Sequence, residues 1–475
     1  MVRFQRLSIA GLAALAVLPA LLLGAVALFA GERRDDAGSP LPAASTVVPT
    51  AAVALTTPLF SARRAPTALA TSHRRAVLGA ALAPLAAAVD NTSCVAVGTD
   101  DQLVVSAHAT VPVIPASNLK LVVAAAAVDI LGADTVFTTK VVGPAPVGGV
   151  VRGDVFLVGG GDPVLSEQWY TQPTALRKRP PLHATAVEAL VDSLKAKGIT
   201  SITGRVVGDG SRYDGERHPP GWGAGVIATP DGVPVGALVI DDSTDQNGVI
   251  AADPAAGAAG DFTRLLRDRG VKVGADAAVG KAPPGATELA VATSQALPAV
   301  INEMLATSDN LSAEMMVKEI GVKVSGKGTR VDGLKAISDR LAAWGIPASG
   351  TTLVDGSGLS RENRLTCAAL LAVLEHDDAT GVVGAGLALA DQGGSTLDGR
   401  FQQPGLAGVL QGKTGTLRGV KALSGYFPTA GGEVEFVLIL NGTSAATFAG
   451  PWGQLGTALL ATTSAATPDQ LAPRT

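Results

Sequence analysis

Pro115-Ala116-Ser117-Asn118-Leu119-Lys120 is the stretch on which the interpretation of this 475-residue chain depends. The residues after it, Leu121–Ile130, are almost all apolar and rich in alanine, and Gly132 follows them. This pattern predicts a helix that begins close to Ser117 and is buried on most of its sides. Because Ser117 and Lys120 are three positions apart, the helix places both side chains on one face.

A serine and a lysine in this arrangement can act as a nucleophile and its base. A serine hydroxyl is a poor nucleophile at its own pKa and needs a base beside it. A lysine can be that base only where burial or a nearby cation lowers its pKa. The apolar run after Lys120 supplies the burial, and the helix N-terminus places a backbone N–H near a developing oxyanion. The Ser-x-x-Lys motif alone is nevertheless a weak signal, because an ordinary helix start often produces it.

Two further motifs follow in the chain and strengthen this interpretation. Ser308-Asp309-Asn310 by itself is typical of a helix N-cap, and Lys413-Thr414-Gly415, followed by Thr416, by itself is typical of a strand end or turn. Ser-x-x-Lys, Ser-Asp-Asn and Lys-Thr-Gly in this order are the signature of serine penicillin-binding enzymes and β-lactamases.

The three motifs assign a role to each of their polar side chains. Ser308 would pass protons between Lys120, Lys413 and the leaving amine. An amide such as that of Asn310 can hold the peptide group of a substrate. The third motif, on a predicted edge strand, can bind a terminal carboxylate and complete an oxyanion hole with the Thr416 N–H. We therefore predict the catalytic residues Ser117, Lys120, Ser308, Asn310 and Lys413, and the substrate-binding residues Asp309, Thr414, Gly415 and Thr416.

Motifs of other enzyme classes fail at individual positions. Gly412-Lys413-Thr414 resembles the end of a P-loop, but Ala407 stands where the first glycine is required. Gly159-Gly160-Gly161 is not a dinucleotide fingerprint, because position 164 is valine. None of the five histidines lies in a recognisable Ser-His-Asp context. A net charge of −4 without basic runs argues against nucleic-acid binding, and we expect neither a metal site nor a cofactor.

The N-terminus predicts export of the chain. Arg3 and Arg6 precede the uncharged apolar run Ile9–Ala30, which at about 22 residues is long enough to cross a membrane as a helix. We expect an uncleaved anchor with a cytoplasmic N-terminus, with a cleaved signal peptide as the alternative. The folded part would then lie outside the cytoplasmic membrane. Residues 1–31 are assigned to this segment, and residues 32–75, rich in Ala, Pro and Thr, to a flexible linker.

The rest of the chain predicts an α+β protein with an inserted domain. Residues 76–136 and 281–465 would form the catalytic domain, with a hairpin of Cys94–Thr99 and Gln102–Ala107 near its start. Residues 137–280 would form a strand-rich insert, and residues 466–475 a tail. The strands expected within the insert include Val150–Val158, Ser201–Val207 and Val235–Ile240.

These features together resemble the D-Ala-D-Ala carboxypeptidase/endopeptidase family of class C penicillin-binding proteins. Further matches are the Gly-Gly-Gly-Asp-Pro segment 159–163, the segment Asp355–Arg361 with Asn363-Arg364, and the Leu417–Val420 extension of the third motif. The resemblance implies a transpeptidase-like fold, with an antiparallel sheet flanked by helices on both faces. It also implies an acyl-enzyme formed on peptidoglycan peptides ending in D-Ala-D-Ala, release of D-Ala, and acylation by β-lactam antibiotics. Some members also cleave cross-links.

Two alternative functions remain open on the sequence. A class A β-lactamase would need a Glu-x-x-x-Asn loop after the second motif, and Glu362-Asn363 has the wrong spacing. A catalytically silent protein that only binds cell-wall peptide would keep the fold without the reaction.

The two cysteines, Cys94 and Cys367, permit one disulfide. An oxidising compartment favours a bond between them. Separately buried thiols are the alternative, because free cysteine is often buried.

Overall fold

The computed structural model describes residues 66–173, 179–429, 431–464, 467 and 470–471. Within these ranges no helix is both long and apolar enough to cross a membrane. The predicted anchor Ile9–Ala30 lies outside the described residues.

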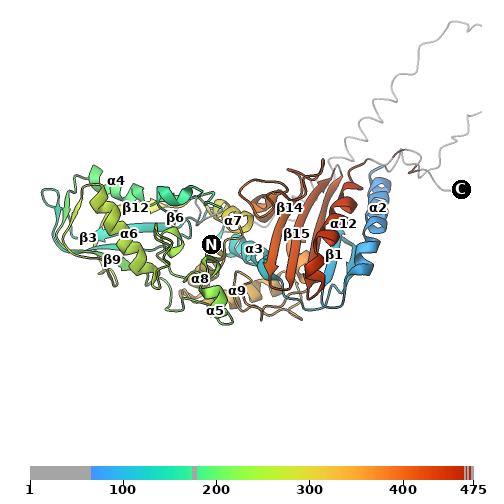
Figure 1. The fold of residues 1–475 in the computed structure, drawn as a ribbon, viewed down its shortest axis with the longest axis horizontal. Coiled ribbons are helices and arrows are strands. Elements are labelled where there is room, and N and C mark those ends of the chain that lie inside the picture. Colours follow the sequence, from blue (N-terminus) through green and yellow to red (C-terminus); the bar gives the residue numbers. More distant parts are fainter. Residues whose placement is uncertain (1–65, 174–178, 430, 465–466, 468–469, 472–475) are drawn as a thin grey trace, which may run out of the picture. The chain divides into compact units, whose positions relative to one another are not determined.

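A six-stranded antiparallel sheet forms the centre of the catalytic domain (Figure 1). The predicted N-terminal hairpin is confirmed, and its first strand pairs with the last strand of the chain, so both ends of the folded sequence meet in this sheet. The strand order is β13 (Ala388–Leu389), β14 (Gln411–Leu417), β15 (Val420–Thr429), β16 (Gly432–Asn441), β1 (Cys94–Thr99) and β2 (Gln102–Ala107).

The central strands of this sheet are buried on both faces, because they are apolar on both sides. In β1, Cys94 and Ala96 pack in one core with α3, whereas Val95 and Val97 pack in the opposite core with α2 and α12. The sheet between helical layers is the α+β architecture that the sequence predicted (Figure 1). The helices are α2 (Pro66–Ala88) and α12 (Ala449–Leu460) on one face, and on the other α3 (Leu119–Leu131), α7 (Leu297–Ala306), α8 (Asn310–Ser325), α9 (Arg330–Ala343), α10 (Cys367–Glu375) and α11 (Val382–Gly386).

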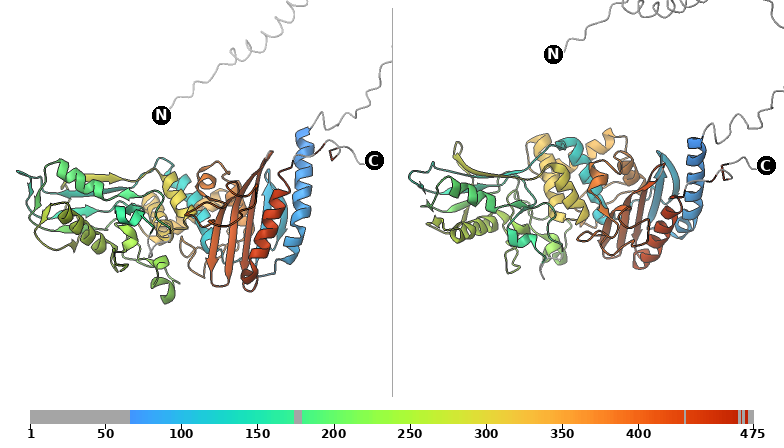
Figure 2. Two further views of the ribbon diagram at one scale, coloured as in Figure 1. Left: turned by 45° about the horizontal axis from the view of Figure 1, so that its top comes forward. Right: turned by 90° about the horizontal axis from the view of Figure 1, so that it is seen from above.

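The predicted linker is wrong over its last residues. Residues 32–75 are predicted from their composition to be a flexible tether, but α2 begins at Pro66. Leu78, Leu82 and Leu85 are buried at helical spacing, and α2 lies beside α12 in each view (Figure 2). The alanine-rich composition concealed this apolar stripe.

The strand-rich insert lies between the first and second motifs, as predicted. Its core is made by a mixed five-stranded sheet, a small parallel sheet and two helices, α4 (Glu188–Ala196) and α6 (Pro254–Asp268). The five-stranded sheet has the order β11 (Ala278–Val279), β9 (Val206–Asp209), β5 (Val155–Val158), β3 (Thr138–Gly143) and β12 (Thr287–Thr293), and the parallel sheet the order β10 (Lys272–Val273), β8 (Ser201–Ile202) and β4 (Val150–Val151). The short strands β6 (Leu165–Ser166) and β7 (Thr185–Ala186) pair nearby, and α5 (Ala224–Ile227) lies in a later loop.

Several expectations about the insert need correction. The predicted strands Val150–Val158 and Ser201–Val207 are each divided between two sheets, since β4 and β8 belong to the parallel sheet and β5 and β9 to the five-stranded sheet. The boundary at residue 280 is too early, because β12 pairs with β3 and so continues the insert sheet to Thr293. The segment Val235–Ile240 forms no strand. Its side chains alternate between the insert core and a cluster with Leu311 and Met315 of α8, so the segment shows strand periodicity without joining a ladder.

Candidate active site

Ser117 and Lys120 lie side by side where the chain enters α3. The 3₁₀ turn Ala116–Asn118 leads directly into this helix, and Lys120 Nζ is 3.1 Å from Ser117 Oγ. Lys120 is fully buried, and burial lowers its pKa to about 8, although nearby carboxylates, Asp309 foremost, raise it. A lysine in this state is a base of moderate strength next to a serine hydroxyl.

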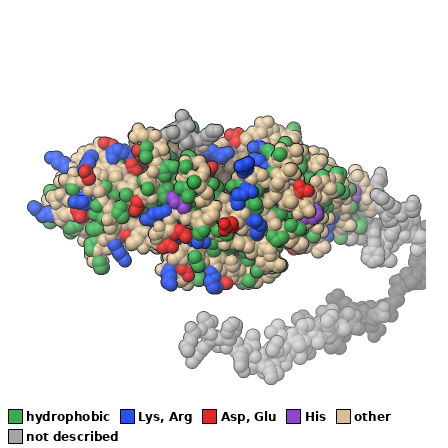
Figure 3. Space-filling view, turned by 60° about the horizontal axis from the view of Figure 1, so that its bottom comes forward, with side chains coloured by type: hydrophobic (Ala, Val, Ile, Leu, Met, Phe, Trp, Pro, Cys, Tyr) green, Lys and Arg blue, Asp and Glu red, His purple; other side chains and the backbone are tan. Residues whose placement is uncertain are grey.

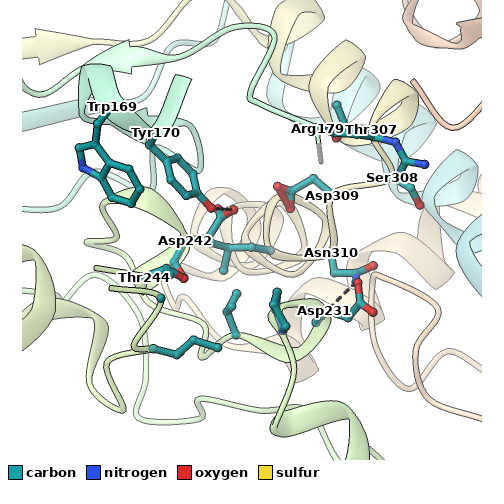
Figure 4. A pocket seen from close by; sticks show the side chains of 15 residues that line it. Trp169, Tyr170, Arg179, Asp231, Asp242, Thr244, Thr307, Ser308, Asp309 and Asn310 are labelled. Carbon is teal, nitrogen blue, oxygen red and sulfur yellow. Dashed lines mark hydrogen bonds between the residues drawn. The ribbon is translucent and has the colours of Figure 1, made fainter. Parts of the chain in front are cut away.

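The second motif meets Lys120 at the start of α8. Lys120 Nζ donates to Asn310 Oδ1 at 2.8 Å and to the Ser357 carbonyl at 2.7 Å. The amide nitrogen of Asn310 donates to the Asp231 carbonyl at 3.0 Å, the contact drawn in Figure 4. Asn310 therefore connects Lys120 to a loop of the insert.

Lys413 and Ser308 form a second lysine–serine pair. Lys413 Nζ donates to Ser308 Oγ at 2.8 Å and to the Thr414 carbonyl at 2.8 Å. Burial foremost, and then the charges of Lys120 and Arg179, lower the pKa of Lys413 well below its usual value. Ser308 has a φ of 67°, a left-handed conformation that is uncommon for serine and typical of functional sites.

The third motif borders the cleft on β14. Strand β13 pairs only with Gln411 and Gly412, so within the described part of the chain β14 has no strand partner on that side from Lys413 onward. A Cβ at Gly415 would lie 3.0 Å from Ala422 Cβ and 3.2 Å from Ala116 Cβ, so glycine lets β14 approach the turn that carries Ser117. The Thr416 side chain is exposed and its hydroxyl accepts from Lys421 Nζ at 3.1 Å.

Asp309 has a structural contact that the sequence also suggested. Its carboxylate accepts from the Ser312 N–H at 2.8 Å and caps α8. It also lines a hollow of about 280 Å³ next to the cleft, with Trp169, Tyr170 and Asp242 of the insert on its other side (Figure 4). The substrate-binding role of Asp309 stays a prediction.

The cleft itself has a volume of about 330 Å³ and contains side chains that no motif indicated. Ser117, Ser308, Asn310, Thr414 and Thr416 line it, together with the cations Arg179, Arg400 and Lys421. In the space-filling view, Lys and Arg side chains are spread over the visible face, and one group of them lies near its middle (Figure 3).

Arg179 is the cation that comes from the insert. Its Nε donates to the Ser395 carbonyl at 3.1 Å, and the side chain lies near Ser308 in Figure 4. The sequence alone does not indicate Arg179, because no motif surrounds it and the insert brings it to the cleft from a position far from the three motifs in the chain.

The two cysteines are joined by a disulfide with a Cα–Cα distance of 6.0 Å. Cys94 begins β1 and Cys367 begins α10, and both are fully buried. The bond fastens a helix to the central sheet across a sequence separation of 273 residues, which includes the whole insert.

The fold and the three motifs together define a serine enzyme of the penicillin-binding class. The chain belongs to the D-Ala-D-Ala carboxypeptidase 3 (S13) family, whose profile matches residues 81–252 and 243–453. This confirms the family predicted from the sequence.

Curated relatives cover most of the chain. Carboxypeptidase DacB of Mycolicibacterium smegmatis is 30% identical over 465 residues, covering 94% of this chain and 93% of that protein. The D-alanyl-D-alanine carboxypeptidase of Actinomadura sp. (strain R39) is 30% identical over 414 residues, covering 70% of this chain and 74% of that protein.

A solved structure shares the fold. Penicillin-binding protein 4 from Haemophilus influenzae superposes with a TM-score of 0.65 at 22% identity, covering 80% of this chain and 98% of that one. A second structure of that protein, complexed with a β-lactam, has a TM-score of 0.61 at 21% identity and the same coverage. The α+β penicillin-binding fold is thereby confirmed.

Proposed function

We propose that this protein is a serine-type D-Ala-D-Ala carboxypeptidase that trims peptidoglycan stem peptides through an acyl-enzyme on Ser117. The observation that carries the proposal is the 3.1 Å contact between the half-buried Ser117 hydroxyl and the fully buried Lys120 amine. Family membership and the carboxypeptidase names of the curated relatives support the reaction.

Acylation begins with proton transfer from Ser117 to neutral Lys120. The serine oxygen attacks the carbonyl carbon of the penultimate D-Ala, and the resulting oxyanion accepts hydrogen bonds that we assign to the backbone N–H groups of Ser117 and Thr416. When the C–N bond breaks, the leaving D-Ala amine needs a proton. The Lys413–Ser308 hydrogen bond of 2.8 Å supplies a path for it, from Lys413 through the Ser308 hydroxyl.

Deacylation reverses the roles of the same groups. Before water attacks, we assign to Ser308 the return of the proton that Lys120 took from Ser117: it passes through the Ser308 hydroxyl to Lys413, so that Lys120 is neutral again and Lys413 regains the proton it gave to the leaving amine. Water then loses a proton to Lys120 and attacks the ester carbonyl, and the Ser117 oxygen leaves and recovers that proton from Lys120. The products are the shortened peptide and the free enzyme, so one water is consumed for each D-Ala released.

The free carboxylate of the substrate is assigned to the β14 side of the cleft. The side chains of Thr414 and Thr416 border this space, and Arg179 lines the same cleft with a permanent positive charge. A β-lactam carries a similar carboxylate next to its reactive carbonyl, so it would acylate Ser117 in the same position.

Radiolabelled or fluorescent penicillin and a D-Ala release assay on a defined pentapeptide test the proposal together. The native protein should become labelled once and should release D-Ala, whereas a folded Ser117→Ala variant should do neither. Persistent labelling of Ser117→Ala would refute the assignment of the nucleophile. Labelling without D-Ala release would identify a silent binding protein, and rapid turnover of the penicillin would identify a β-lactamase.

The substrate places the site of action outside the cytoplasmic membrane, and we propose that residues 9–30 hold the protein there. The support is the length and apolar character of Ile9–Ala30 behind Arg3 and Arg6. The intact mass of the protein from membranes of its own cells should include this run. A mature N-terminus at or beyond Gly31 would show that the segment is cleaved.

A further inference from the structure

The segment Asp355-Gly356-Ser357-Gly358 lies directly against the catalytic turn, although the reaction described above does not use its side chains. Gly358 has a φ of +83°, and a Cβ there would lie 1.9 Å from the Ala116 carbonyl oxygen. Only glycine fits this position, because it needs both the left-handed backbone and the close approach. The turn is therefore pressed against the residue that precedes Ser117.

One peptide group of this turn connects Lys120 to a buried carboxylate. The Ser357 carbonyl accepts from Lys120 Nζ at 2.7 Å. The N–H at the other end of the same peptide group, that of Gly358, donates to Asp355 Oδ1 at 2.9 Å. Lys120, the Ser357–Gly358 peptide group and the Asp355 carboxylate are therefore linked by a continuous series of hydrogen bonds. The side chains of Lys120 and Asp355 are both fully buried.

The geometry at the lysine shows what this chain of bonds can do. A neutral amine has two N–H bonds and one lone pair. Ser357 O at 2.7 Å and Asn310 Oδ1 at 2.8 Å each accept one N–H, and the remaining neighbour is Ser117 Oγ at 3.1 Å. The two acceptors therefore turn the lone pair toward the serine hydroxyl.

We propose that Asp355 is a positioning residue that orients the base lysine through the Ser357–Gly358 peptide group. This inference rests on the proposed role of Lys120 as the base. Serine nucleophiles are often activated by a base that a third group orients. Here Ser117 would be the nucleophile, Lys120 the base and Asp355 the orienting group, and the Ser357–Gly358 peptide group lies between Lys120 and Asp355.

Other contacts hold the carboxylate and the turn in place. The second oxygen of Asp355 accepts from the Ser360 N–H at 2.6 Å and from Trp222 Nε1 at 2.9 Å, the latter donated by the insert. Asn363 Nδ2 donates to the first oxygen at 2.7 Å. Glu314, which is also buried, accepts from the N–H groups of Gly356 and Ser357 at 2.7–3.1 Å. Asp355 thus receives four hydrogen bonds, and Glu314 fixes the preceding peptide groups.

The pH dependence of acylation distinguishes a loss of the Asp355 charge near Lys120 from a general loosening of the site around the lysine. Burial is the largest cause of the low pKa of Lys120, whereas nearby carboxylates raise it. Removal of the Asp355 charge with packing intact should therefore lower the pKa of Lys120. Entry of water into a loosened site should raise it toward the value of a solvated lysine. The charged groups that face Lys120 in this site are Asp231, Asp309, Glu314, Asp355 and Lys413.

The test compares Asp355→Asn with Asp209→Asn in the intact protein. Asp209 is a matched control, since it is a buried carboxylate of the insert that accepts two backbone N–H groups, at 2.9 and 2.8 Å, away from the catalytic cleft. Acylation by a fluorescent penicillin is measured from pH 6 to 10, and Tm is recorded for each variant.

On the plateau above the midpoint, Asp355→Asn should slow acylation by about 10- to 100-fold, below the full effect of a positioned base. The pH midpoint should move downward, so the loss should be smaller below the midpoint, where more of the lysine is then neutral. Asp209→Asn should lower only Tm. A plateau rate of Asp355→Asn within about twofold of the parent, or an upward shift of its midpoint, overturns the inference.

A second variant keeps the proposal testable if Asp355→Asn does not fold. Glu314→Gln keeps one oxygen acceptor and should slow acylation by about tenfold with a downward midpoint shift; parental kinetics would overturn the inference. Lys120→Arg is measured in the same series. Normal acylation by Lys120→Arg refutes the base assignment and this inference with it, whereas a slow Lys120→Arg beside a normal Asp355→Asn refutes this inference alone.

Discussion

The rate of acyl-enzyme formation should rise with pH through a midpoint near 8. Lys120 must be neutral to accept the Ser117 proton, and burial lowers the pKa of Lys120 to about 8. With this pKa, about a tenth of the molecules carry neutral Lys120 at pH 7 and about nine tenths at pH 9, so the rate should increase roughly tenfold between these values. A lysine with its ordinary pKa would give roughly a hundredfold increase over the same interval.

A single-turnover experiment distinguishes these two slopes. The protein is mixed with excess fluorescent penicillin at several pH values between 6 and 9.5, and labelled protein is quantified against time. Circular dichroism at each pH shows that the fold is retained. A rate that does not change with pH, or one that rises a hundredfold between pH 7 and 9, would refute the argument that burial prepares Lys120 as the base.

The variant Lys120→Arg is the control for the identity of the titrating group. Arginine keeps the positive charge but is not deprotonated in this range, so the variant should lose at least about a hundredfold in acylation rate. If the midpoint near 8 persists in this variant at a normal rate, another group accepts the proton.

Two further predictions concern substrate recognition and stability. Arg179→Ala should lower kcat/KM about tenfold for peptides with a free terminal carboxylate, the value of one charge-assisted hydrogen bond at a solvated site. The same variant should keep its kcat/KM for analogues whose C-terminus is amidated. The control variant Arg152→Ala, which replaces an exposed arginine of the insert, should keep the parental kcat/KM on both kinds of peptide. An equal loss by Arg179→Ala on both kinds of peptide counts against the assignment. Replacing Cys94 and Cys367 by alanine should lower the free energy of unfolding by about 5 kcal/mol, given the length of the closed loop, and unchanged urea denaturation would contradict this.

The elements of the catalytic domain were predictable because their local patterns agree with their packing. The Cys94–Thr99 and Gln102–Ala107 strands appear with the expected ends, since short β-branched runs around Asp100-Asp101 leave few alternatives to a hairpin. The expected buried helix after Ser117 is α3, whose apolar residues contact the sheet and the other helices of its layer. At these positions propensity and tertiary contacts favour the same structure.

Prediction failed where composition and burial pointed in different directions. The first ten residues of α2, 66–75, were predicted as part of a linker because alanine, proline and threonine dominate the region before them. Only the spacing of Leu78, Leu82 and Leu85, further along the helix, marks its buried face. Val235–Ile240 has the alternation of a strand because it lies between two cores. Its backbone bonds go to irregular partners, such as Arg217 O at 2.8 Å for the Val235 N–H.

Three short motifs predicted the side chains that we propose as catalytic, but no motif predicted the groups that we propose to orient them. Lys120 and Ser357 are 237 positions apart, and their contact uses a backbone carbonyl, an atom that every residue possesses. A sequence therefore records such a contact only indirectly, through the residues that shape the turn. Here these are Gly358, which alone permits the approach to Ala116, and Asp355, which bonds the same peptide group from its other end. The Asp355-Gly356-Ser357-Gly358 segment is therefore related to the proposed base Lys120 through its backbone, because the Ser357 carbonyl, and not a side chain of the segment, accepts the lysine's hydrogen bond.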